Sequence, residues 1–184
     1  MGKYLTDVRK IFEYYKSLGE KAINQLEDAE LFWQYNETSN SIAIIINHLH
    51  GNMMSRWTDF LSSDGEKEWR QRDQEFEDHI KTKDEIWQKW EEGWQCLFTA
   101  LDTINDDNFT NIVTIRQQEH TISEAINRQL AHYAYHVGQI VYIARMAKDS
   151  KWQSLSIPKN KSQAFNEKKY AQGKHSGHFS DDIK

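Results

Sequence analysis

The stretch TISEAINRQLAHYAYHVGQIVYIARM, residues 121–146, is the most apolar late segment of the chain and predicts its last long helix. Thr121 is followed three residues later by Glu124, the capping-box pattern that begins many helices. Inside the stretch, His132 and His136 are four residues apart, so on a helix their imidazoles point the same way and can reach one divalent ion. We therefore expect a helix that contributes two ligands to a metal site.

Apolar side chains recur at three- and four-residue spacing in three earlier segments, which predicts three more amphipathic helices. The connection between the second and third of them, residues 66–83, is almost wholly polar and long enough to cross a helical bundle from end to end. Residues 109–115 alternate and include β-branched side chains, which indicates a small strand or hairpin before the last helix. We expect an all-α fold with helices at residues 4–27, 39–60, 84–104 and 121–146.

Length and composition indicate one domain. The chain has 184 residues, enough for a single core of ordinary size. Its seven tryptophans and single proline favour long helices with bulky packing faces. We expect the domain to cover residues 1–165 and a polar, irregular and mobile tail to cover residues 166–184.

Charge and hydropathy exclude several classes of partner. The net charge of -5 is spread over interspersed acidic and basic residues, with none of the basic stripes that nucleic acid requires. The longest apolar run, residues 42–46, is too short to cross a bilayer. The single cysteine, Cys96, excludes an intramolecular disulfide, and the N-terminal residues lack the pattern of a signal peptide. We expect a cytoplasmic protein that binds neither nucleic acid nor membranes.

The second helix offers His48 and His50 as the third metal ligand, but only one of them can face the site. Two positions along a helix differ by about 200°, and a helical wheel places His50 about 80° and His48 about 120° from the centre of the apolar stripe. Periodicity therefore favours His50. The flank of His48 carries Asn52, Arg56 and Asp59 at helical spacing, a polar line that fits either a functional cavity or a solvated face.

The face of the last helix that carries His132 and His136 also carries Gln129 and Gln139, a mixture that suits a pocket. The plainer interpretation is that His132 and His136 are core histidines hydrogen-bonded to their neighbours. The other histidines lie in polar connections or in the tail, where we expect surface side chains: His79, His120, His175 and His178.

Three motifs carry a family resemblance: HLHGNMMSRWTDFLSSDGEK (residues 48–67), INRQLAHYAYHVGQI (126–140) and LSIP (155–158). They resemble the DUF1572 branch of the DinB and YfiT-like metalloenzyme superfamily. The resemblance implies a four-helix bundle in up-down-down-up order, with a long crossover between the second and third helices. It also implies a divalent ion, usually nickel or zinc, held by His48, His132 and His136. His50 then becomes a packing residue or a neighbour of the ligands.

Three imidazole ligands leave a coordination position open, where an ion can activate water for hydrolysis or bind a thiol as a nucleophile. Relatives in the superfamily include metal-dependent transferases that use low-molecular-weight thiols such as bacillithiol, so the resemblance implies a thiol-dependent transferase acting on a small molecule. In such a site we expect Arg56 to clamp a carboxylate and Asp59 to hold Arg56 by a salt bridge. Gln129 and Gln139 would orient water, substrate or the histidines.

Two other functions remain open. A non-catalytic metal-binding bundle, acting in stress response, would have its ion closed off by aromatic side chains, whereas an enzyme needs a cavity that opens toward the ion. A metal-free bundle would use its tryptophan-rich faces for self-association. The resemblance also implies a homodimer, because bundles of this family often pair.

Overall fold

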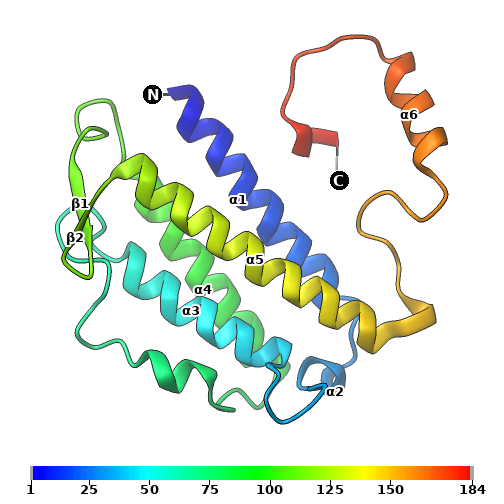
Figure 1. The fold of residues 1–184 in the computed structure, drawn as a ribbon, viewed down its shortest axis with the longest axis horizontal. Helices are drawn as coiled ribbons and strands as arrows, with labels where there is room; N and C mark the ends of the chain where they lie inside the picture. The colour runs from blue at the N-terminus through cyan, green and yellow to red at the C-terminus, as the bar shows by residue number, and fades with distance from the viewer. Residues whose placement is uncertain (1, 183–184) are drawn as a thin grey trace.

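The structure, a computed structural model, describes residues 2–182 and is mostly helical, with one small antiparallel hairpin (Figure 1). This confirms the prediction of a helical chain with a hairpin before its last long helix. The α-helices are α1 (Gly2–Ile23), α2 (Asp28–Leu31), α3 (Ile42–Trp57), α4 (Lys83–Asp102), α5 (Ile122–Lys148) and α6 (Ser162–Ala171). The strands are β1 (Ile112–Ile115) and β2 (Gln118–Thr121), and the short 3-10 helices are η1 (Arg72–Phe76), η2 (Asp149–Lys151) and η3 (Phe179–Asp182).

The four long helices α1, α3, α4 and α5 enclose one hydrophobic core (Figure 1). Helix α3 packs along α4 and also contacts α5, while α1 packs along α5. The centre of the core is aromatic, with Trp57, Trp94 and Tyr133 buried against Phe12. Trp57 Nε1 donates to the Tyr133 hydroxyl (2.9 Å), which donates in turn to Asn52 Oδ1 (3.0 Å). This chain of hydrogen bonds fixes the position of α3 relative to α5.

The connection between α3 and α4, residues 58–82, follows the outside of α3 and includes η1 (Figure 1). Helix η1 is held against α3 because Asn47 Nδ2 donates to the Glu75 carbonyl (3.0 Å). The Glu75 side chain is buried against Gly51, where an added Cβ would overlap the carboxylate. Only glycine at position 51 permits this close approach.

The hairpin is anchored to the same connection. Strand β1 pairs with β2 in the register Ile112↔Thr121, and the turn residues Arg116 and Gln117 have φ values of 55° and 61°. The Asp64 carboxylate accepts hydrogen bonds from the backbone N–H groups of Arg116 (2.8 Å) and Gln117 (2.7 Å). Asp64 therefore fixes the turn of the hairpin.

Element boundaries differ from those expected. Helix α1 ends at Ile23, before the predicted residue 27, and α3 ends at Trp57, where Thr58 leaves the helical conformation. The expected irregular tail contains η3 and the second half of α6, so the predicted domain boundary at residue 165 falls inside a helix. Side chains around η3 contact α1 through Phe179 on Tyr14 and an ion pair of Asp181 with Lys10 (2.9 Å). Within residues 2–182, no helix is long and apolar enough to span a membrane.

Candidate metal centre

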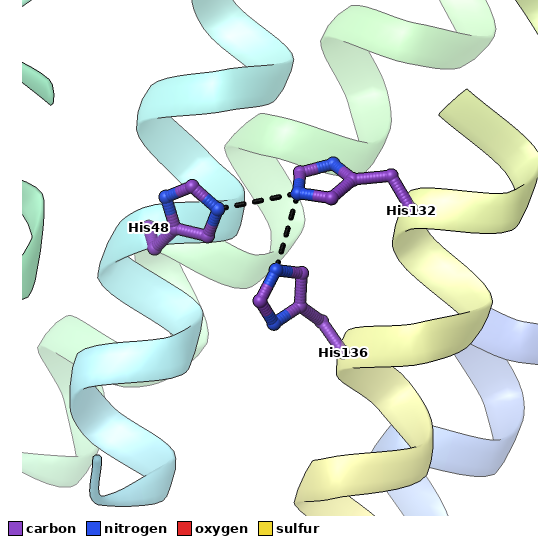
Figure 2. A group of neighbouring side chains, drawn as sticks. All are labelled: His48, His132 and His136. Atoms are coloured by element: carbon purple, nitrogen blue, oxygen red, sulfur yellow. Dashed lines mark hydrogen bonds between the residues drawn. The ribbon is translucent and has the colours of Figure 1, made fainter. Parts of the chain in front are cut away.

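His48 of α3 and His132 and His136 of α5 converge on one point (Figure 2). The Nε2 atom of His132 lies 3.3 Å from Nε2 of His48 and 3.1 Å from Nε2 of His136. Two nitrogens bound to one tetrahedral ion at about 2.0–2.1 Å lie about 3.3 Å apart. Both distances match this value, and one ligand atom from each of the three side chains lies within 4.8 Å of the other two, so the group could hold a metal ion.

The proton on His48 is fixed by a buried carboxylate. His48 Nδ1 lies 2.8 Å from Glu75 Oε2. Burial alone would raise the pKa of Glu75, but hydrogen bonds from His48 and Arg70 outweigh it and lower the pKa below its usual value. Because an ionised carboxylate only accepts hydrogen bonds, Nδ1 of His48 donates to Glu75 and Nε2 of the same ring faces His132.

His136 has the same arrangement with an amide as its partner. Its Nδ1 donates to Gln139 Oε1 (2.8 Å), which leaves a lone pair on Nε2. His132 can donate from Nε2 to at most one of the two neighbouring lone pairs, and its Nδ1 is buried with no hydrogen-bond partner among the described residues. His132 is therefore the one member of the cluster with a buried ring nitrogen that has no partner among the described residues.

His132 and His136 do not supply a positive charge themselves. Burial, and then the charges of His136 and His48, lower the pKa of His132 to about 3. Burial, and then His48, lower the pKa of His136 to about 4. Both imidazoles are thus neutral at pH 7, the form that binds a metal ion.

Residues of the α3–α4 connection support His48. Arg70 binds Glu75 through Nε to Oε1 (2.7 Å) and Nη2 to Oε2 (2.9 Å), a bidentate pair that orients the carboxylate. The Phe76 ring stacks on the His48 imidazole, with centroids 4.6 Å apart. Arg70, Glu75 and Phe76 therefore fix the ring orientation of His48 before any ion binds.

A cavity of about 480 Å³ lies beside the three histidines. Most side chains around it are polar, and arginine is the most frequent residue type. The lining residues are Asn40, His48, Asn52, Arg56, Arg70, Arg72, Phe76, Arg116, Arg128, Gln129, His132, Tyr135, His136 and Gln139. An ion on the histidines would be within reach of a small molecule in this cavity.

Most of the residues expected near the ion lie around this cavity, and one does not. Asn52, Arg56, Gln129 and Gln139 line it together with the histidines. Asp59 is exposed and lies in a different depression, beside Cys96. The carboxylate nearest to Arg56 is that of Glu66, at 3.9 Å.

The histidines outside the cluster differ in burial. His50 Nε2 lies 3.1 Å from Glu92 Oε2 of α4, so it points away from α5. His79 and His175 are exposed, as predicted, and His178 is half-buried. The prediction of a surface side chain is wrong for His120, which is 5% exposed. Its place in β2, opposite Val113, turns the imidazole inward, where Nε2 lies 3.3 Å from Arg128 Nη1.

Sequence reasoning missed the residues that reach the site from outside α3 and α5. Glu75, Arg70 and Phe76 lie in a polar connection with no periodicity to mark them. The position of Arg128 beside the site could have been predicted from the sequence, because Arg128 precedes His132 by the same four residues that separate His132 from His136.

Residues 1–161 match a protein family described as "Protein of unknown function (DUF1572)". The search of curated proteins and the search of solved structures returned no match.

Proposed function

The chain belongs to the DUF1572 family, and we propose that it binds one divalent metal ion, nickel or zinc, through His48, His132 and His136. One observation carries the proposal: Nδ1 of His48 and Nδ1 of His136 both face fixed acceptors, so the Nε2 atoms of these two rings meet at His132 Nε2. A divalent cation satisfies this donor set, whereas a metal-free core histidine would have a donor and an acceptor partner.

We also propose that α1, α3, α4 and α5 form the DinB-like bundle in up-down-down-up order. Side-chain contacts support parallel α1 and α5, because Tyr4 contacts Ser123 near the start of both helices and Gln25 contacts Gln153 beyond their ends. Similar evidence supports parallel α3 and α4, where His50 contacts Glu92 and Thr58 contacts Cys96. The connection that includes η1 would be the long crossover.

The proposed activity is that of a metal-dependent enzyme acting on a small molecule, with a low-molecular-weight thiol or water as the nucleophile. A divalent ion with three protein ligands supplies an open position that lowers the pKa of a bound thiol or water. The chain itself orients the ligands through Glu75 and Gln139. Arg56 and Gln129, which line the cavity, would position the substrate.

The shape of the site favours an enzyme over a non-catalytic metal protein. A cavity that adjoins the histidines supports access for a substrate, and its only aromatic lining residues among those described are Phe76 and Tyr135. Tryptophan and phenylalanine side chains do not close it. The homodimer and the cytoplasmic location stay predictions; exposed Tyr135 and Tyr142 on α5 offer a surface for pairing.

Elemental analysis of the protein purified without a histidine tag tests the metal site. We expect about one equivalent of nickel or zinc in the wild type and in His50→Ala, and none in His48→Ala or His132→Ala. A wild type that takes up neither nickel, zinc nor manganese would disprove the site. A positive result justifies a screen for thiol transfer and for hydrolysis, with His132→Ala as the inactive control.

A further inference from the structure

The cavity beside the histidines has a local charge opposite to that of the whole chain. The chain has a formal net charge of -5, yet five arginines line the cavity: Arg56, Arg70, Arg72, Arg116 and Arg128. No aspartate or glutamate is among the described lining residues. A concentration of guanidinium groups in a concave site is the usual environment for a carboxylate or phosphate.

The carboxylates nearby are too few to neutralise these arginines. Glu66 Oε2 is shared, since it lies 2.9 Å from Arg70 Nη1, 3.5 Å from Arg116 Nη2 and 3.9 Å from Arg56 Nη2. Glu75 is already engaged by Arg70 and His48. The wall of the cavity is therefore positive before any divalent ion is added.

Two of the arginines have unused hydrogen-bonding capacity. Arg56 is 3% exposed, and its Nε and Nη1 have no hydrogen-bond partner among the described residues. Burial lowers the pKa of Arg56 to about 10, so the side chain is still charged at pH 7. Arg128 has Nη1 3.3 Å from His120 Nε2 and no carboxylate partner within residues 2–182. The buried donors of Arg56 destabilise the fold unless a ligand binds them, whereas Arg128 is exposed and lines the cavity with donors free to bind a ligand.

We infer that the substrate carries a compact dianionic group, the chemistry shared by a phosphate monoester and a pair of neighbouring carboxylates, and that Arg56 and Arg128 bind it. This inference rests on the proposed function only in taking the histidines as the reacting end of the cavity. Arg128 lies one turn from His132 on α5, so a dianion on the arginines leaves the rest of a small molecule beside the histidines. A cavity of about 480 Å³ holds such a molecule.

Calorimetric titration of the metal-loaded full chain with inorganic phosphate and, separately, with succinate at constant ionic strength tests the inference. We expect at least one of the two to bind. Arg128→Gln should weaken that binding about tenfold or more, as loss of a charge-assisted hydrogen bond predicts. Arg145→Gln removes the same charge from an exposed position of α5 outside the cavity and should change the affinity less than twofold.

Arg56→Lys is the second variant, because it keeps the charge and loses the planar fork; its folding is checked by circular dichroism. A loss of affinity in this variant supports bidentate binding. Tighter binding of phosphate identifies a phosphate monoester as the substrate group, and tighter binding of succinate identifies paired carboxylates.

His132→Ala separates this inference from the metal proposal. Anion binding that persists in His132→Ala and still depends on Arg128 supports the arginine site even if no metal is found. Binding that disappears in His132→Ala and is unaffected by Arg128→Gln means that the anion binds the ion alone, which overturns the inference. Failure of both anions to bind also overturns it.

Discussion

Helix α3 carries two histidines two residues apart, and they face different cavities. His48 lines the cavity with His132 and His136, whereas His50 lines a second cavity of about 410 Å³ together with His79 and Lys89. Both cavities are lined mostly by polar residue types, and both include Arg70. Polarity and the presence of a histidine therefore do not separate a candidate metal site from an ordinary surface depression.

His48 and His50 differ in their burial and in the side chains that contact each imidazole. His48 is 4% exposed and its Nδ1 is fixed by buried Glu75, while His50 contacts Glu92, whose side chain is 47% exposed. No group of three metal-ligating side chains within residues 2–182 includes His50. A metal site depends on a second helix that supplies further ligands and on a buried acceptor that fixes the proton.

The largest expected effect is on stability with and without metal. At a metal concentration 1,000 times the Kd, an ion that binds only the folded chain stabilises it by about 4 kcal/mol. We expect a chelator to remove this stabilisation from the wild type and from His50→Ala, and to have no effect on His132→Ala. Urea denaturation with and without metal measures the difference. Identical urea denaturation curves for the wild type with and without metal would contradict the proposal that the His48 cavity, unlike the His50 cavity, holds an ion.

A second test compares the two glutamates that contact these histidines. Glu75→Gln should weaken metal binding about 10- to 100-fold, because loss of the carboxylate that orients a ligand has effects of this size. Glu92→Gln should leave the affinity unchanged. Competition with a chromogenic chelator gives both values. Equal affinities for the two variants would show that Glu75 does not orient His48.

Two glycine variants sharpen the comparison further. In Gly51→Ala the new Cβ overlaps the Glu75 carboxylate, so we expect a loss of about 1–3 kcal/mol in the free energy of unfolding and weaker metal binding. In Gly138→Ala the new Cβ meets nothing within 4 Å, so we expect the free energy of unfolding to rise by about 0.5–1 kcal/mol. Denaturation of both variants distinguishes a specific clash from a general effect of alanine. A stabilised Gly51→Ala would refute the close approach.

The smallest expected effect is that of replacing Asp64, which holds the hairpin in place. The hairpin turn contributes Arg116 to the His48 cavity and no residue to the His50 cavity. Burial would raise its pKa, but backbone N–H groups of Gln117, Glu66 and Arg116 outweigh burial and lower the pKa to about 2. The contribution of ionised Asp64 to the free energy of unfolding is therefore fully present above the unfolded pKa of about 3.9. It is lost as the pH falls through about 2. We expect Asp64→Asn to lower the free energy of unfolding by about 1 kcal/mol at pH 7, a value that allows for solvent screening. The difference from the wild type should vanish between pH 4 and pH 2 in acid denaturation, and a constant difference would contradict the assignment.

Periodicity predicted the helices because it is a local property of the sequence. The predicted capping box at Thr121 and Glu124 is half formed where α5 begins: Thr121 Oγ1 accepts from the Glu124 backbone N–H (3.2 Å), while Glu124 Oε1 lies 3.4 Å from His120 Nδ1. The expected strand or hairpin at residues 109–115 is β1 together with β2, which extends a few residues further along the chain. Helix ends were less predictable, since they depend on packing as well as on sequence.

The site was only partly predictable for the same physical reason. Two histidines four residues apart are visible in any helical sequence, but the choice between His48 and His50 came from the family resemblance, against the helical wheel. Glu75 reaches His48 from a connection without periodicity, through the space that Gly51 leaves. Such long-range contacts, like the inward turn of His120, have no signature in local spacing.

The distance along the chain between His48 and His132, 84 residues, has a consequence for how the proposed ion would be acquired. During synthesis the first ligand emerges long before the other two, and the three nitrogens meet only when α5 has docked on α3. An unfinished chain on the ribosome therefore has no complete binding site to sequester metal. Loading of the proposed ion would therefore follow folding, and its release would require transient separation of these two helices.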